Sequence, residues 1–319
     1  MRSVRRRAGG ENAIFWGVVS SLLFSVTYVV NNAMSRSGGD WLWGASLRFL
    51  FMLPPLLILT AARKELQAVF REIRRAPMGW LLWSTVGFGI FYAPITFASA
   101  YGPSWLVAGT FQFTILAGAL LTPIFRLPDD TRGHIPVGLF PAFLIIILGV
   151  FLIQLDHVQA VQNAGTLLYA LPVLLSATAY PLGNRKMMAL CENRLNTVQR
   201  VLGMTLCSLP LWIALAIGGY LRSGWPSGMQ TVQSLVVALF SGLFATILFF
   251  HATQMVQTQP KLLAMVESTQ CGEVVFSLFG GVLLLHDPLP DAVGWIGLLL
   301  IVGGMIFNSL FSIKSDAVR

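Results

Sequence analysis

Two carboxylates and an amide lie inside the apolar stretch Pro260–Pro290, among Leu, Val, Phe and Gly residues. A charged side chain at the centre of a bilayer costs about 2.5–3.5 kcal/mol on insertion scales, so such residues face a bundle interior or a wet cavity. On a helix, Glu267, Gln270 and Glu273 fan across about 120°, with the amide between the acids. We expect this polar arc to bind a cation or to exchange a proton. Hydrogen bonding between neighbouring helices is the alternative.

The composition indicates that the elements around these acids span a membrane. Of the 319 residues, 55% are hydrophobic and 11% are charged, whereas about 25% are charged in soluble domains. Apolar runs of about twenty residues fall at 12–34, 41–61, 78–99, 103–125, 136–155, 164–184, 197–218, 230–251, 260–285 and 291–312. We therefore predict an all-α polytopic protein with ten transmembrane helices, which passes many times through the cell (inner, cytoplasmic) membrane.

The positions of the cations predict the orientation. With the N-terminus inside, most Lys and Arg residues fall in cytoplasmic segments, and only Arg36 and Arg222 lie outside. Both termini are then cytoplasmic, residues 1–11 as a basic tail and residues 313–319 as a short one. Residues 62–77 place apolar side chains on one helical face with cations around it, which predicts a short amphipathic helix on the membrane surface.

Ten helices divide into two sets of five, residues 12–155 and residues 164–312. Because five is odd, the second copy must insert upside down, which predicts a 5+5 inverted-topology repeat. Arg48 precedes a proline-ended run in the second helix and Arg200 precedes one in the seventh, at opposite membrane faces in this topology. We expect both arginines to have a structural part, in which they reach lipid headgroups.

The sequence contains no catalytic or metal-binding pattern. His134, His157, His251 and His286 lie apart, without metal-ligand spacing, and neither a nucleophile elbow nor a phosphate-binding loop is present. The cations lie in short loops and not on one soluble face, which argues against nucleic acid. We therefore expect no enzyme, no metal and no cofactor. The expected partners are the lipid bilayer and a small-molecule substrate, and the chain is a monomer or a homodimer.

Several passages resemble the ten-helix members of the drug/metabolite transporter superfamily. Ala45–Leu50, with its arginine–phenylalanine pair, resembles the second helix, Pro172–Lys186 the sixth, and Gly280–Met305 the ninth and tenth with their short turn. Gly109–Phe113 and Glu267–Glu273 resemble the subgroup of putative multidrug resistance efflux transporters.

The chain also departs from these relatives. Their short turn usually has Glu before Pro, whereas this chain has Asp287. The small four-helix multidrug relatives use a glutamate within the first helix, but Glu11 lies at the membrane edge here. Any proton-coupling or cation-binding group must therefore be Glu267 or Glu273.

We interpret the chain as a secondary active transporter that exports drug-like cations or amphipathic metabolites by alternating access. The coupling ion, H⁺ or Na⁺ or none, stays open. A cavity between the two repeats is expected to be lined by Tyr92, Gln112, Tyr180 and Gln270, with Trp16, Phe111 and Phe249 as further candidates. An importer or exchanger of metabolites or amino acids is one alternative, and a non-transporting scaffold or sensor subunit is another.

Overall fold

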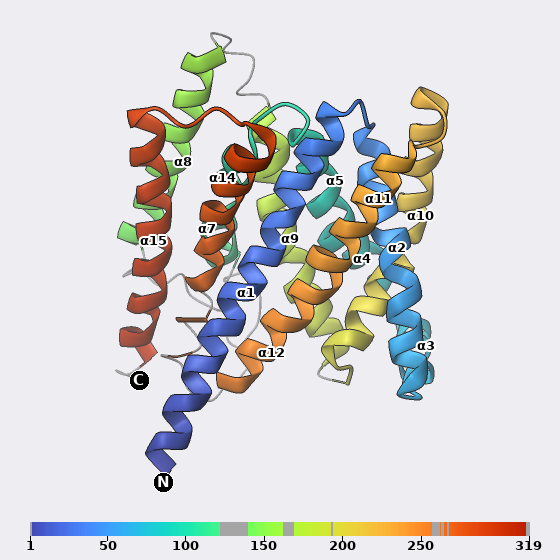
Figure 1. Ribbon diagram of the computed structural model, residues 1–319. Helices are drawn as coiled ribbons and strands as arrows, with labels where there is room; N and C mark the ends of the chain where they lie inside the picture. The colour runs from blue at the N-terminus through green and yellow to red at the C-terminus, as the bar shows by residue number, and fades with distance from the viewer. Residues whose placement is uncertain are drawn as a thin grey trace.

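The described part of the chain is a bundle of helices that pack side by side (Figure 1). The computed structural model describes residues 2–121, 140–161, 169–192, 194–256, 262, 265–266 and 268–316, and within these ranges there is no strand. Six helices are long and apolar enough to cross a membrane: Asn12–Arg36, Trp41–Ala62, Pro77–Ala98, Phe140–Gln159, Thr197–Ser223 and Gly228–Thr253. Three shorter apolar helices accompany them: Ser104–Leu120, Thr269–Leu285 and Ala292–Asn308. The fold is that of a multi-pass helical membrane protein.

The described helices follow one another along the chain in two halves. The first half of the chain contains α1 (Arg2–Arg36), α2 (Trp41–Ala62), α3 (Leu66–Arg75), α4 (Pro77–Ser84), the π-helical η1 (Thr85–Ile90), α5 (Phe91–Ala98), α6 (Ser104–Phe111), α7 (Thr114–Leu120) and α8 (Phe140–Val161). The second half contains α9 (Ala170–Cys191), α10 (Thr197–Ser223), α11 (Gly228–Val237), the π-helical η5 (Ala238–Ala245), α12 (Thr246–Val256), the 3₁₀ turn η6 (Thr269–Cys271), α14 (Gly272–Leu285) and α15 (Ala292–Asp316).

Side-chain caps begin the two helices that carry the membrane arginines. The Asp40 carboxylate accepts a hydrogen bond from the Leu42 amide at 2.9 Å and starts α2. Asn196 and Gln199 form a reciprocal capping box at the start of α10, with bonds of 3.0 and 2.7 Å. Such caps satisfy amide groups that have no partner inside the helix. They fix where α2 and α10 begin, and the two helices then pack against each other.

The predicted surface helix forms as α3, but much of its apolar face is covered by protein. Val69 is 0% exposed and Ile73 packs against the same core, whereas Phe70 stays exposed. Glu72 is buried beside them and pairs with Arg194 of the α9–α10 connection at 2.9 Å. The sequence predicted a surface helix over residues 62–77, and the structure adds that part of its apolar face packs against protein. Contacts with α10 bury the apolar face, a partner that local periodicity cannot reveal.

Four membrane segments depart from regular α-helix, and they fall in matching places. The third segment contains the π-helical η1 and the eighth contains η5. The fourth segment breaks between α6 and α7 at Gln112–Phe113, and the ninth enters α14 through the 3₁₀ turn η6. The sequence predicted apolar runs over 103–125 and 260–285 and did not indicate these breaks within them.

Different elements lie at the two ends of the bundle (Figure 1). The start of α1, the end of α15 and helix α3 lie at the lower end of the view, while the α1–α2 and α10–α11 turns lie at the upper end. Helix α1 packs against α12, α14, η5 and α11, and helix α2 packs against α10, α5 and η5. Helices α1 and α2, which carry polar residues inside their apolar segments, therefore each contact several other helices of the bundle.

Candidate functional site

A cavity of about 290 Å³ lies among helices from both halves of the chain. The polar residues on its wall include Arg48 from α2, Gln112 from the α6–α7 break, Tyr180 and Asn184 from α9, Arg200 from α10, Gln270 from η6 and Glu273 from α14. Aromatic rings supply much of the remaining wall, namely Phe24, Tyr28, Phe49, Phe88, Phe91, Phe111, Phe249 and Phe250. An apolar pocket with a few convergent polar groups is the usual form of a small-molecule site.

Glu273 is the acid of this cavity. Its side chain belongs to a residue that is 8% exposed and lies in the first turn of α14, where the helix dipole favours negative charge. The Tyr28 hydroxyl donates to Glu273 Oε2 at a long 3.3 Å. Within the part of the chain that the structure describes, no Lys, Arg or His side chain pairs with this carboxylate. A carboxylate held in this way can take up a proton or a cation.

Arg48 also belongs to the cavity wall. The residue is 6% exposed, and its guanidinium carbon lies 3.9 Å from the centre of the Tyr92 ring. Its Nη2 donates to Ser241 Oγ at 3.4 Å, and its buried Nε has no hydrogen-bond partner. Arg200 lies on the same wall, with its guanidinium carbon 5.9 Å from the Phe250 ring centre.

The two arginines therefore differ from the expectation that they reach toward lipid headgroups. Sequence reasoning offered headgroups because they are the usual polar surroundings of an arginine near a membrane. In the structure the Arg48 guanidinium contacts the Tyr92 ring of α5 and the Ser241 hydroxyl of η5 in place of headgroups. Arg200 lies one turn into α10 and faces the cavity.

The cavity brings together most of the other residues that the sequence singled out. Gln112, Tyr180, Gln270 and Glu273 all line it, as do Phe111 and Phe249. Tyr92 does not: it is 0% exposed behind Arg48, and its hydroxyl accepts a hydrogen bond from Asn31 Nδ2 at 3.0 Å. Trp16 packs in a separate cluster with Ala13. Glu267 lies outside the described residues.

Sequence reasoning missed the contribution of α1. Tyr28 reaches Glu273, and Thr27 shares a 2.5 Å hydrogen bond with Ser241. A signal was present, because polar side chains recur on one helical face of the first apolar run, at Ser20, Thr27 and Asn31, seven and four residues apart. This stripe marks the face of α1 that points into the bundle.

Asp287, in the α14–α15 turn, joins several segments at the end of the bundle opposite the start of α1. Its side chain is buried and forms an ion pair with Arg36 of α1. Its Oδ2 accepts a hydrogen bond from the Ser104 amide at the start of α6, at 2.9 Å. Trp105 Nε1 also donates to Pro288 O at 3.1 Å. Three separate segments are thus joined at one end of the bundle.

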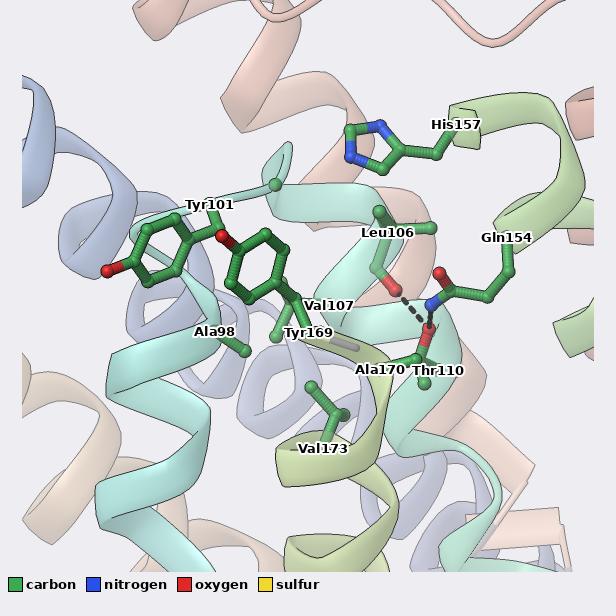
Figure 2. A pocket seen from close by; sticks show the side chains of 11 residues that line it. Ala98, Tyr101, Leu106, Val107, Thr110, Gln154, His157, Tyr169, Ala170 and Val173 are labelled. Carbon is green, nitrogen blue, oxygen red and sulfur yellow. Dashed lines mark hydrogen bonds between the residues drawn. The ribbon is translucent and has the colours of Figure 1, made fainter. Parts of the chain in front are cut away.

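A second, narrow pocket lies between α5, α6, α8 and α9, and Figure 2 shows that Gln154, Thr110 and Leu106 are hydrogen-bonded to one another. Gln154 Nε2 donates to Thr110 Oγ1 at 2.8 Å, and that hydroxyl donates to Leu106 O at 2.7 Å. The Tyr101 and Tyr169 rings stack with 4.2 Å between centroids. The space is about 10 Å³, roughly that of one water molecule. The central cavity is the better candidate for ligand binding. Among the described residues, no His, Cys, Asp and Glu cluster is arranged to hold a metal ion.

The sequence of the chain is similar to that of several known proteins. Residues 11–314 match the EmrE family, described as putative multidrug resistance efflux transporters. The chain is 48% identical over 307 residues to the uncharacterized protein YjlA of Bacillus subtilis (strain 168). The match covers 94% of this chain and 95% of that protein. It is 45% identical over 272 residues to an uncharacterized 42.1 kDa protein of Shouchella clausii, over 84% of this chain and 71% of that one.

A solved crystal structure of a protein has a similar fold. The TM-score is 0.62, and the match covers 96% of this chain and 99% of that chain at 14% sequence identity. At that identity the likeness concerns the fold alone.

Proposed function

Because this chain belongs to the family of putative multidrug resistance efflux transporters in the drug/metabolite transporter superfamily, we propose that it is a secondary active transporter that exports small amphipathic organic molecules. The observation that carries the proposal is the central cavity, in which one carboxylate, Glu273, faces aromatic rings and amides inside a bundle of apolar helices. A structural scaffold has no need of a cavity of about 290 Å³ with buried charges on its wall.

We propose that the two halves of the chain form a 5+5 inverted repeat. The paired irregularities support this, since π-helical stretches occur in the third and eighth segments and breaks occur in the fourth and ninth. Gln112 lies at one break and Gln270 at the other, and both line the cavity. Binding sites of inverted-repeat transporters lie between the repeats, often beside interrupted helices. Movement of one half against the other would then expose the site to either side of the membrane.

Glu273 is the coupling group in this proposal. It lies on one of the broken segments and has one long hydrogen bond, so its carboxylate can exchange partners without the loss of an ion pair. A proton bound on one side would be exchanged for the cationic group of a substrate bound on the other. Aromatic faces such as those of Phe91 and Tyr180, whose ring centroids lie 4.7 Å apart, suit an organic cation or the apolar part of a metabolite.

Flux through sealed liposomes tests the function. A thermal-shift screen against amines, amino acids and nucleosides first selects a compound that stabilises the purified chain. We expect that compound to cross the liposome membrane at a saturable rate that depends on an imposed ion gradient. Flux without saturation would indicate a channel. A lack of flux with every stabilising compound would contradict the transporter proposal and favour a scaffold or sensor.

The proposed orientation, with both termini and α3 in the cytoplasm, makes a labelling prediction. Gln67 on α3 and Ser223 at the end of α10 are both exposed, and α3 and the end of α10 lie at opposite ends of the bundle (Figure 1). In a background without the three native cysteines, a membrane-impermeant thiol reagent added outside intact cells should label Ser223→Cys and leave Gln67→Cys unlabelled. Permeabilised cells serve as the control, in which both should react. The reverse pattern in intact cells would contradict the orientation.

A further inference from the structure

Arg48 is a buried cation whose hydrogen-bonding capacity is almost unused. A guanidinium carries five N–H donors in a planar fork. At Arg48 one of them reaches Ser241 Oγ at 3.4 Å, which is longer than an ordinary hydrogen bond, and Nε has no acceptor. Within the described part of the chain, no carboxylate lies within 4.0 Å of it. Buried arginines are normally paired, because an uncompensated buried charge is costly.

The neighbours of Arg48 hold it in place without neutralising it. Tyr92 supports the guanidinium from one side, and the hydrogen bonds between Tyr92 and Asn31 fix that ring. Ser241 is held in turn by its 2.5 Å contact with Thr27. These contacts come from α1, α5 and η5, so three helices position the fork at the cavity wall. The remaining donor face has no protein acceptor within the described residues.

A second, opposite charge faces the same cavity. Glu273 and Arg48 both line it, yet they form no ion pair with each other. Two buried charges of opposite sign that stay apart across a cavity are complementary to a ligand that carries both signs. Aromatic rings line the same cavity, so the ligand also has an apolar body. The volume of about 290 Å³ lies just below the range of roughly 300–1,000 Å³ for ligand pockets, so the ligand is small.

We propose that Arg48 is an anion-binding subsite, so that the molecule carried in the cavity is a small amphipathic zwitterion whose carboxylate binds Arg48 while its ammonium group faces Glu273. A single carboxylate matches the fork geometry of the Arg48 guanidinium. This inference deepens the proposed transport function and rests on it for its physiological meaning.

The test uses three probes that share a phenyl group and differ in charge: phenylalanine has both charges, phenethylamine lacks the carboxylate, and 3-phenylpropionate lacks the ammonium group. Affinity is measured by calorimetry on the full chain in detergent, at equilibrium and without a gradient. We expect phenylalanine to bind about tenfold or more tightly than phenethylamine, as a charge-assisted hydrogen bond to a buried guanidinium implies. Failure of transport in liposomes would leave this comparison intact, so the two proposals fail separately.

Variants assign the effect to one residue. In Arg48→Gln, phenylalanine and phenethylamine should bind equally, because the carboxylate has lost its partner. In Arg48→Lys, which keeps the charge and is the safer variant for folding, the preference should fall but not vanish, because the ammonium group lacks the fork. Arg71→Gln is the matched control, since it removes an exposed arginine of α3 that does not line the cavity, and it should keep the preference. Arg200→Gln locates the subsite, because it removes the other arginine of the same wall.

Three results would contradict the proposal. Equal affinity of the unaltered chain for phenylalanine and phenethylamine, including no measurable binding of either, removes the anion subsite. Loss of the preference in Arg200→Gln with its retention in both Arg48 variants would move the subsite to the other arginine and contradict the assignment. Tighter binding of phenethylamine than of phenylalanine would show a purely cationic site.

Discussion

Glu273→Gln is expected to reduce gradient-driven transport to the level of protein-free liposomes while the protein folds normally. The amide keeps the shape of the carboxyl group and can still accept a hydrogen bond from Tyr28, but it cannot bind a proton or balance a cation. Without a group that alternates between proton and substrate, the gradient has no means to drive uphill movement. Removal of a buried charge also lowers a desolvation cost, so stability should be unchanged or higher.

Two controls separate coupling from packing. Glu273→Asp keeps the charge and should retain part of the gradient-driven rate. Glu192→Gln makes the same chemical change at an exposed residue in the α9–α10 connection and should transport like the unaltered chain. Transport is measured as initial uptake at several pH values, and folding is measured by gel filtration and thermal unfolding. Full pH-dependent uptake by Glu273→Gln would leave the carboxylate a structural role only.

The positions of the helices could be predicted from the sequence because they depend on local properties. An apolar run of about twenty residues and the caps at its ends are visible in one stretch of chain, so helices occupy the described parts of all ten predicted runs. The polar arc was visible for the same reason, since Gln270 and Glu273 interrupt an otherwise apolar segment. Both residues line the cavity.

What could not be predicted depends on neighbours far away in the chain. The polar arc of the 260–285 run does not indicate which face of α5 points inward. Tyr92 was therefore expected on the cavity wall, but it lies behind Arg48. No proline lies at the break at Gln112, so the local sequence does not indicate it. Arg48 was expected at headgroups because its real surroundings, the Tyr92 ring and Ser241, come from residues that are 44 and 193 positions away. Long-range contacts override local preference at these places, and they are the places that form the cavity.

Gly183→Ala is expected to destabilise the fold more than any other single methyl group placed on the cavity helices. Gly183 of α9 lies directly against the backbone of Gly87 in η1, and an added Cβ would collide with the Cα and N atoms of Gly87. Backbone cannot move aside as a flexible side chain does, so the two segments must separate. Overpacking of this kind costs about 1–3 kcal/mol, and here it falls beside the cavity residues Tyr180 and Asn184 of the same helix.

The matched control is Gly303→Ala on α15, where an added Cβ has nothing within 4 Å. Because alanine favours helix over glycine by about 0.5–1 kcal/mol, that variant should unfold at the same temperature as the unaltered chain or slightly higher. Gly183→Ala should unfold at a clearly lower temperature in the same detergent, and it should also bind cavity ligands more weakly because α9 carries part of the wall. Equal unfolding temperatures for the two variants would mean that α9 and η1 are not in close contact. Small residues at such crossings let membrane helices approach closely, and the position of α9 at the cavity depends on that approach.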